Sequence, residues 1–161
     1  RFNNLMGETF IIPEAKIQDE TKYITGTDGE KMSKSKNNII DIFVDDKTLR
    51  KQIMKIETRS LSVEDPKNPQ ECIVFKLYEV IASRNEVESL KKQYLKGGIG
   101  YGTAKELLFD KILNRFSKNR KKYFELLEDR PELENLLSDG SKRARVQAQK
   151  VLKRVRSRIG F

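Results

Sequence analysis

Residues 103–127, TAKELLFDKILNRFSKNRKKYFELL, carry the clearest periodicity in the chain. Their apolar members recur mostly three or four positions apart: Leu107, Leu108, Ile112, Phe116, Tyr123 and Leu127. This spacing places the apolar side chains on one face of an α-helix, where they can pack on a core. Thr103 can cap the start of that helix. The stretch therefore predicts a long amphipathic helix in a mainly α protein.

Helical patterns continue on both sides of this stretch. We expect helices at residues 45–58 (capped by Asp45 or Asp46), 73–82, 103–127, 131–140 and from about 142 to 159, with a short helical segment led by Ser83 and ended by Gly97. Residues 62–70 contain two prolines and should form a loop. The last helix carries its own apolar stripe: Ala144, Ala148, Val151, Leu152, Val155 and Ile159. Residues 43–161 are thus predicted to form a helical bundle of about five helices.

The first 42 residues follow a different pattern. Residues 9–12 and 22–25 are short β-rich runs, and the turn cluster Gly26-Thr27-Asp28-Gly29 follows the second run. Two short strands do not make a stable sheet by themselves. We therefore expect residues 1–42 to be the last strand and loop of a larger domain, in a chain cut from a longer protein, since it starts at Arg1 rather than Met.

Composition excludes several classes of protein. The chain of 161 residues has no His, which removes Ser-His-Asp and Cys-His triads and His metal ligands, and its single Cys72 allows no internal disulfide. We expect no metal bound by the protein itself. One cysteine fits a reducing compartment and so a cytoplasmic protein. No run approaches the roughly 20 apolar residues that span a bilayer.

The positive charge is concentrated near the C-terminus. Residues 142–161 contain eight Lys and Arg and no Asp or Glu, which is nearly all of the net charge of +9. These bases could contact RNA phosphates or an anionic membrane, or they could be the solvated face of a packed helix. Because the stripe contains small residues and no Trp, we favour the packed helix, with phosphate contact as an additional role and no membrane binding.

Residues 26–35, GTDGEKMSKS, carry the chemistry. The glycines permit close backbone approach to a ligand, and two lysines three positions apart supply charges that can follow a polyphosphate. Ammonium groups held beside a departing pyrophosphate stabilise the transition state more than the ground state. Most Lys/Ser-rich loops are only solvated turns. The exact string KMSKS favours phosphate binding, because average residue usage produces it in such a chain less than about once in ten thousand trials.

KMSKS at residues 31–35 spells the second signature of the class I aminoacyl-tRNA synthetases. Residues 12–17 (IPEAKI), residues 36–42 (KNNIIDI) and the turn at residues 100–102 (GYG) also resemble the C-terminal half of bacterial tryptophanyl-tRNA synthetases. The resemblance covers essentially the whole chain. It implies that residues 1–42 end a Rossmann-like nucleotide-binding catalytic domain and that residues 43–161 form the anticodon-binding helical domain.

The resemblance also implies an activity and its residues. The family joins tryptophan to tRNA(Trp) through an adenylate, using ATP and Mg²⁺. The residues matched to ATP binding are Lys31, Met32, Ser33, Lys34 and Ser35. Lys31 and Lys34 are the catalytic candidates, holding the pyrophosphate end of ATP, on a loop that closes as ATP binds. For the anticodon, the best candidates are Arg84, Asn85 and Glu86 at a helix start, although an ordinary capped helix start fits them equally well. Tyr101, between two glycines, is a further candidate for stacking on a base.

Alternatives remain open at this point. The chain could belong to a tyrosyl-type synthetase, which shares the architecture. It could also be a helical RNA-binding module that is not an enzyme and contains the KMSKS string by coincidence. The family's first signature contains His, which this chain lacks, so we expect the chain alone to be inactive in adenylation. The family's enzymes are homodimers joined mainly through the nucleotide domain, which leaves room for this chain alone to be a monomer.

Overall fold

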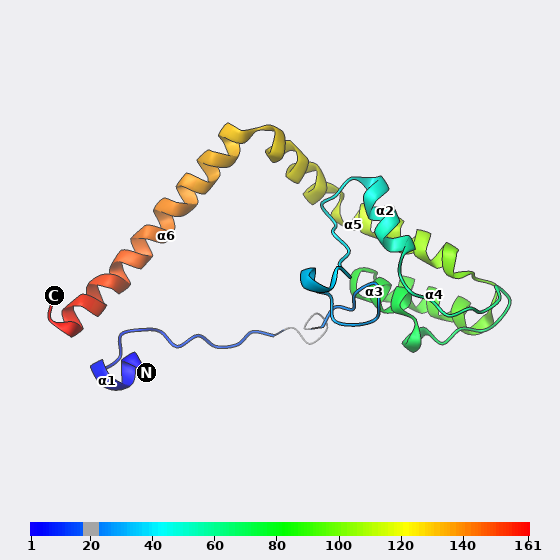
Figure 1. Cartoon of the computed structure of the whole chain (residues 1–161), viewed down its shortest axis with the longest axis horizontal. Coiled ribbons are helices and arrows are strands. Elements are labelled where there is room, and N and C mark those ends of the chain that lie inside the picture. The colour runs from blue at the N-terminus through cyan, green and yellow to red at the C-terminus, as the bar shows by residue number, and fades with distance from the viewer. Residues whose placement is uncertain (18–22) are drawn as a thin grey trace. The chain divides into compact units, whose positions relative to one another are not determined.

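A computed structural model describes residues 1–17 and 23–161. In this described part the α-helices are α1 (Phe2–Met6), α2 (Asp46–Met54), α3 (Ile73–Ile81), α4 (Arg84–Lys96), α5 (Tyr101–Glu128) and α6 (Arg130–Ile159), as Figure 1 shows. Two short 3₁₀ helices, η1 (Lys34–Lys36) and η2 (Pro69–Glu71), lie in the connections. The prediction of a mainly α fold is confirmed. No helix among the described residues has both the length and the apolar character needed to cross a membrane.

The chain divides into two compact units, each described here by itself. One unit comprises residues 17–121, and the other comprises residues 1–16 together with 122–161. Helix α5 begins in the first unit and ends in the second. The predicted boundary at residue 42/43 falls inside the first unit, so the KMSKS loop and helices α2 to α4 are parts of one compact body.

The core of the unit at residues 17–121 is built from helices α2 to α5. Its most deeply buried hydrophobic side chains, each at most 2% exposed, are Leu49, Ile53, Ile56, Val74, Phe75, Tyr94, Ala104 and Leu108. The Tyr94 ring lies 5.5 Å from the ring of Phe75, and its hydroxyl lies 3.4 Å from Sγ of the buried Cys72. Burial raises the pKa of Tyr94. Cys72 is therefore a buried thiol in the packed interior.

Local chemistry sets most of the helix ends. Asp45 caps α2 through a bond from the Thr48 amide at 3.0 Å, as predicted. However, α2 ends at Met54, four residues before the predicted end, because the amide of Glu57 donates to the carbonyl of Thr27 at 2.9 Å instead of continuing the helix. Helix α4 ends before Gly97, whose φ of +81° suits glycine. The α5 helix begins at Tyr101, two residues before the predicted Thr103.

The two helices predicted after residue 130 are one helix. Helix α6 runs without interruption from Arg130 to Ile159 and contains Gly140, the predicted end of the first helix. An interior glycine costs only about 1 kcal/mol relative to alanine, and good helix formers on both sides outweigh that cost. No residue of α6 is fully buried. The predicted packed stripe is accordingly only half-buried at Val151 and Val155, and its other members, Ala144, Ala148, Leu152 and Ile159, are exposed.

The predicted strand at residues 9–12 is also wrong. The side chain of Asn3 occupies the backbone groups that a partner strand would need: its Oδ1 accepts from the amides of Thr9 and Phe10, and its Nδ2 donates to the carbonyl of Phe10 at 2.7 Å. Of the second predicted strand, Lys22 lies outside the described residues, and Thr25 forms an isolated antiparallel bridge with Lys31. That bridge is the only β pairing in the described part of the chain.

Candidate functional site

The KMSKS segment lies on a tight turn that is closed by the backbone. The bridge between Thr25 and Lys31 is reinforced by bonds from the Gly26 amide to the Glu30 carbonyl at 2.7 Å and from the Met32 amide to the Ile24 carbonyl at 2.8 Å. Gly29 adopts a φ of +85° in the turn. These bonds hold the backbone of Lys31, the first residue of the signature, at the end of the turn.

Asn38 organises the inside of this loop. Its side chain is 2% exposed, and its Nδ2 donates to Oδ1 of Asp28 at 2.8 Å and to the carbonyl of Lys31 at 3.1 Å. Its Oδ1 accepts from the amide of Ser33 at 2.8 Å, and its own carbonyl accepts from Thr27 at 2.9 Å. The bond from Asn38 is the main cause that lowers the pKa of the Asp28 carboxyl, so this carboxylate stays charged at neutral pH.

The reactive side chains of the loop point to its exposed side. Lys31, Lys34 and Ser35 are exposed, whereas Met32 is half-buried against the core. The hydroxyls of Ser33 and Ser35 lie 2.8 Å apart. Within the described part of the chain, neither Lys31 nor Lys34 is held by an acidic side chain. The two ammonium groups therefore remain available to an anionic ligand.

Lys36 differs from the other lysines of the loop. Its ammonium forms an ion pair with Glu30 at 3.5 Å. The pair links the 3₁₀ turn η1 to the residue before the signature, and it is exposed enough to contribute little stability. Lys36 therefore differs from Lys31 and Lys34, because its charge is already paired with an acidic side chain.

The loop is attached to the helical body at two points. The amide of Glu57, just beyond α2, donates to the carbonyl of Thr27. The turn at Gly29 lies against the first residue of α3, since a Cβ at Gly29 would come 3.3 Å from Cδ1 of Ile73. The segment after the loop is held as well, because Arg120 on α5 donates to the carbonyl of Ile42 and to the carboxylate of Asp46.

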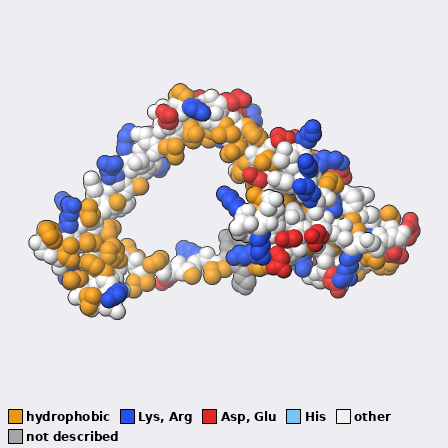
Figure 2. Space-filling view, viewed as in Figure 1, with side chains coloured by type: hydrophobic (Ala, Val, Ile, Leu, Met, Phe, Trp, Pro, Cys, Tyr) orange, Lys and Arg blue, Asp and Glu red, His pale blue; other side chains and the backbone are white. Residues whose placement is uncertain are grey.

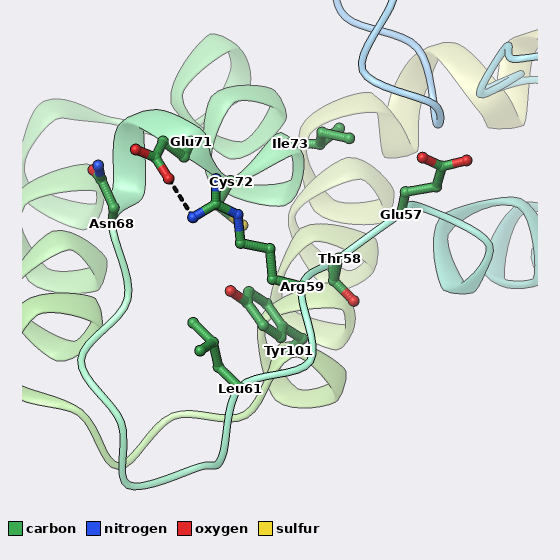
Figure 3. A pocket seen from close by; sticks show the side chains of 9 residues that line it. All are labelled: Glu57, Thr58, Arg59, Leu61, Asn68, Glu71, Cys72, Ile73 and Tyr101. Atoms are coloured by element: carbon green, nitrogen blue, oxygen red, sulfur yellow. Dashed lines mark ion pairs between the residues drawn. The ribbon is translucent and has the colours of Figure 1, made fainter.

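A hollow of about 250 Å³ opens next to this attachment. Figure 3 shows Arg59 and Glu71 pointing toward each other across it, with the ring of Tyr101 beside them, and their charged groups are 2.6 Å apart. Burial raises the pKa of Tyr101. The lining residues are Glu57, Thr58, Arg59, Leu61, Asn68, Glu71, Cys72, Ile73 and Tyr101. The hollow is smaller than the roughly 300–1,000 Å³ of pockets for drug-sized ligands.

A buried lysine lies beside the Tyr101 ring, which lines this hollow. Lys67 is 2% exposed, and its ammonium donates to the carbonyls of Ser62 and Asp65 at 2.7 and 2.9 Å and to that of Val63 at 3.3 Å. It also lies 5.5 Å from the centre of the Tyr101 ring. These bonds fold residues 62–67 into a fixed loop around one charge, which holds the Tyr101 ring in place.

The corner at residues 84–86 is a capped helix start with two exposed side chains. Glu86 closes a capping box with Ser83 and accepts two bonds from Lys111 at 2.6 and 2.7 Å. The bond from Lys111 is the main cause that lowers the pKa of Glu86 to about 2. Arg84 and Asn85 are exposed. Among the described residues, no hydrogen bond or ion pair joins this corner to the KMSKS loop.

Sequence reasoning located the loop but missed Asn38, Arg59, Glu71 and Lys67. Asn38 stands beside Asn37 in a polar run, and no local signal separates the buried amide from the exposed one. Arg59 and Glu71 come together only through the fold of the linker. Tyr101, singled out by its flanking glycines, does line a cavity. The described residues hold no cluster of three or more Cys, Asp or Glu side chains that could bind a metal ion.

Comparison with known proteins shows the family to which this chain belongs. The family described as tRNA synthetases class I (W and Y) matches residues 1–117, and the chain belongs to that family. It is 41% identical over all 161 residues to a tryptophan–tRNA ligase of Campylobacter jejuni and 42% identical over 160 residues to that of Rhodopirellula baltica. The chain spans about half the length of these curated relatives.

A solved structure gives the same result. The crystal structure of tryptophanyl-tRNA synthetase from Campylobacter jejuni, complexed with ADP and tryptophan, matches 99% of this chain and 50% of its own chain, with a TM-score of 0.85 and 41% identity. The sequence-based assignment to the tryptophanyl branch of the class I synthetases is confirmed. The tyrosyl alternative and the stand-alone RNA-binding module are not supported by these relatives, which are all tryptophan–tRNA ligases.

Proposed function

We propose that this chain supplies the nucleotide-phosphate loop and the anticodon-binding body of an enzyme that activates tryptophan with ATP and transfers it to tRNA(Trp). The observation that carries the proposal is the pair of exposed ammonium groups of Lys31 and Lys34, which no acidic side chain holds among the described residues, on a loop whose backbone Asn38 fixes. The family and the relatives named above support tryptophan as the amino acid.

The proposed role of the loop is electrostatic. As the bond between the α- and β-phosphates breaks, negative charge builds on the departing pyrophosphate. Lys31 and Lys34 would stabilise that charge. Because the Ser33 and Ser35 hydroxyls bond to each other, the one that accepts in that bond can donate its own hydrogen bond to the same oxygens. Met32, half-buried beside the core, would place its backbone beside the adenine. None of these groups needs to transfer a proton, which fits a chain without His.

Mg²⁺ enters this proposal only as an ion carried by ATP. Mg²⁺ prefers carboxylate, carbonyl and phosphate oxygens. The exposed side of the KMSKS segment instead offers ammonium and hydroxyl groups, and the described residues hold no metal-binding cluster. The residues therefore do not fit a protein-bound Mg²⁺, and none is assigned to it. The ion would neutralise phosphate charge alongside the lysines.

The proposed anticodon contacts come from the helical body. Anticodon bases are read as unstacked single-stranded bases by stacking and by hydrogen bonds to their edges. The hollow beside Tyr101 offers a ring for stacking and the Arg59–Glu71 pair for edge contacts. Arg84 and Asn85 remain candidates for a neighbouring nucleotide, while Glu86, whose carboxylate is already bonded, positions the start of α4.

The enzyme is proposed to work in the cytoplasm as a homodimer. The free Cys72 fits a reducing compartment, where protein synthesis takes place. The dimer is implied by the family alone, and sedimentation of the full-length enzyme tests it. The chain by itself is expected to show no ATP–pyrophosphate exchange.

A chimera tests the role of the loop. This chain would be joined to the part of the Campylobacter jejuni ligase that it does not match, and tryptophan-dependent ATP–pyrophosphate exchange would be measured. Lys34→Ala should lower kcat/KM by about a hundredfold or more, because a preorganised charge at the transition state is lost. Lys36→Ala, the matched control on the ion-paired lysine, should change it less than about threefold. Equal losses in both variants would contradict the proposal.

A further inference from the structure

Helix α6 presents a continuous basic face that the proposed function does not use. Between Lys142 and Arg158 it carries eight bases and no acid: Lys142, Arg143, Arg145, Lys150, Lys153, Arg154, Arg156 and Arg158. All eight are exposed, and Figure 2 shows Lys and Arg side chains at intervals along this helix. In the described part of the chain only Lys142 has an acidic partner, Asp139, at 3.0 Å. Seven of these charges therefore have no ion pair with any described residue.

The helix that carries these charges is a continuous scaffold. Because α6 runs without interruption from Arg130 to Ile159, its segment from Lys142 to Arg158 is a single helical rod, about 24 Å long at 1.5 Å per residue. Val151 and Val155, the half-buried residues of this segment, lie on one face. Helical spacing places Lys142 and Lys153 on the opposite face. Lys142 thus points away from the valine face, whereas Lys153, Arg154 and Arg158 line hollows beside the N-terminal segment of the same unit while staying exposed.

We propose that this face binds the ribose-phosphate backbone of a structured RNA without reading its bases. A row of exposed, unpaired bases along one rod can follow several phosphates, and each contact releases counterions. The choice of RNA as the polyanion rests on the proposed function, in which tRNA is the substrate. The basic face would supply affinity that does not depend on sequence, in addition to any anticodon recognition by the other unit.

The charge distribution favours RNA over a lipid surface. Helices that lie on membranes bury a bulky apolar face rich in Trp, Phe and Leu. The apolar side of this segment instead has Ala144 and Ala148 at its centre, and the chain has no Trp. Val151 and Val155 are already half-covered within the unit. Leu152 is the one exposed Leu of the described segment 142–158, which contains no Phe or Trp, so a membrane would meet a small apolar face.

The test compares two variants that remove the same charge from different places. In the 161-residue chain, the first carries Arg143→Gln, Arg145→Gln and Lys150→Gln on α6. The matched control carries Lys76→Gln, Lys92→Gln and Lys96→Gln, three exposed bases of α3 and α4. Glutamine has nearly the same helix propensity as lysine and arginine, so both variants should keep their helicity by circular dichroism. Affinity for tRNA(Trp) and for a short RNA duplex of unrelated sequence is measured across a salt series.

The α6 variant should lose about tenfold or more in affinity at 0.1 M salt, and the slope of log K against log salt should become shallower by about 2 to 3, for both RNAs. The control should leave the slope unchanged. The proposal is overturned if both variants behave alike, if the α6 variant loses affinity only for tRNA(Trp), or if it keeps its RNA affinity and loses binding to anionic phospholipid vesicles. Failure of the anticodon proposal is separate, since it shows as equal binding of tRNA(Trp) and an anticodon-changed tRNA by the unmodified chain.

Discussion

Nδ2 of Asn38 donates a hydrogen bond at 2.8 Å to Oδ1 of Asp28, across the base of the loop that carries Lys31 and Lys34. The same amide group fixes the carbonyl of Lys31 and the amide of Ser33. The two lysines are exposed, yet the backbone between them is held from below by one buried side chain. The loop thus offers exposed charges on a backbone that Asn38 holds in place.

Asn38→Ala should therefore damage both stability and nucleotide binding. The substitution leaves the Ser33 amide and the Lys31 carbonyl without their partner, at a cost of about 1–3 kcal/mol in the free energy of unfolding. Urea unfolding checks the stability, and exchange kinetics of the chimera check the loop. Asn119→Ala, at an exposed position on α5, is the control and should change neither. An unchanged urea midpoint for Asn38→Ala would refute the role of the amide.

Two glycines should respond to alanine in opposite ways. A Cβ at Gly26 would lie 2.4 Å from Nδ2 of Asn38 and 2.8 Å from its carbonyl oxygen, so Gly26→Ala should destabilise the loop by about 1–3 kcal/mol. Gly140 has no atom within 4 Å of such a Cβ and lies inside α6, so Gly140→Ala should stabilise that helix by about 1 kcal/mol. Urea unfolding measures the first and thermal loss of helicity the second. A destabilised α6 in Gly140→Ala would mean that the helix needs a break at this position.

The contribution of Glu86 to the free energy of unfolding should change with pH between about 2 and 4.5. Its folded pKa is about 2, below the ordinary value of 4.5 for a glutamate, because Lys111 and Ser83 bond to the carboxylate. A lowered folded pKa means that the unfolded chain binds more protons in this range, so stability rises with pH. The contribution is complete above about pH 4.5 and is lost as the pH falls toward 2.

Glu86→Gln isolates this effect. Its urea midpoint should lie below that of the unmodified chain at pH 6, and the two midpoints should converge as the pH approaches 2. Glu88→Gln, two residues along on the exposed side of α4, is the control and should track the unmodified chain at every pH. A gap between Glu86→Gln and the unmodified chain that stays constant with pH would exclude the charged pair as its source.

The sequence predicts a helix or strand boundary correctly where one or two neighbouring residues determine that boundary. The start of α2 at the Asp45 cap and the end of α4 at Gly97 follow from the chemistry of one or two residues, and both predictions are confirmed. The break at Gly140 was wrong, because its modest propensity cost does not outweigh the helix formers on either side. The strand at residues 9–12 was wrong because the Asn3 side chain, six and seven residues away, satisfies that backbone.

The functional site, too, could be predicted only where a local sequence motif marks it. The KMSKS string locates the loop and the family from the sequence alone, and the comparisons confirm the family. Asn38 and Lys67 could not be singled out, because each acts through backbone groups that only the folded chain brings to it. Arg59 and Glu71 are both common surface residues until the linker places them 2.6 Å apart.

The hollow beside Tyr101 leads to the last prediction. If one anticodon base stacks on this ring, Tyr101→Leu should weaken binding of tRNA(Trp) by about 1–3 kcal/mol, because base–aromatic stacking is worth that much per base. Tyr101→Phe keeps the ring and should bind nearly as the unmodified chain does. Arg59→Gln removes one edge contact and opens the pair with Glu71, so it should reduce discrimination between tRNA(Trp) and an anticodon-changed tRNA. Filter binding at two salt concentrations measures all three variants.

The salt dependence separates this pocket from the basic face of α6. Substitutions in the hollow remove no more than one positive charge, so they should shift affinity by a similar factor at both salt concentrations and leave the salt slope almost unchanged. Loss of binding in Tyr101→Phe as severe as in Tyr101→Leu would show that the hydroxyl, and not the ring, makes the contact. Equal discrimination by Arg59→Gln and the unmodified chain would instead move the site of anticodon reading away from this hollow, toward Arg84 and Asn85 on the exposed start of α4.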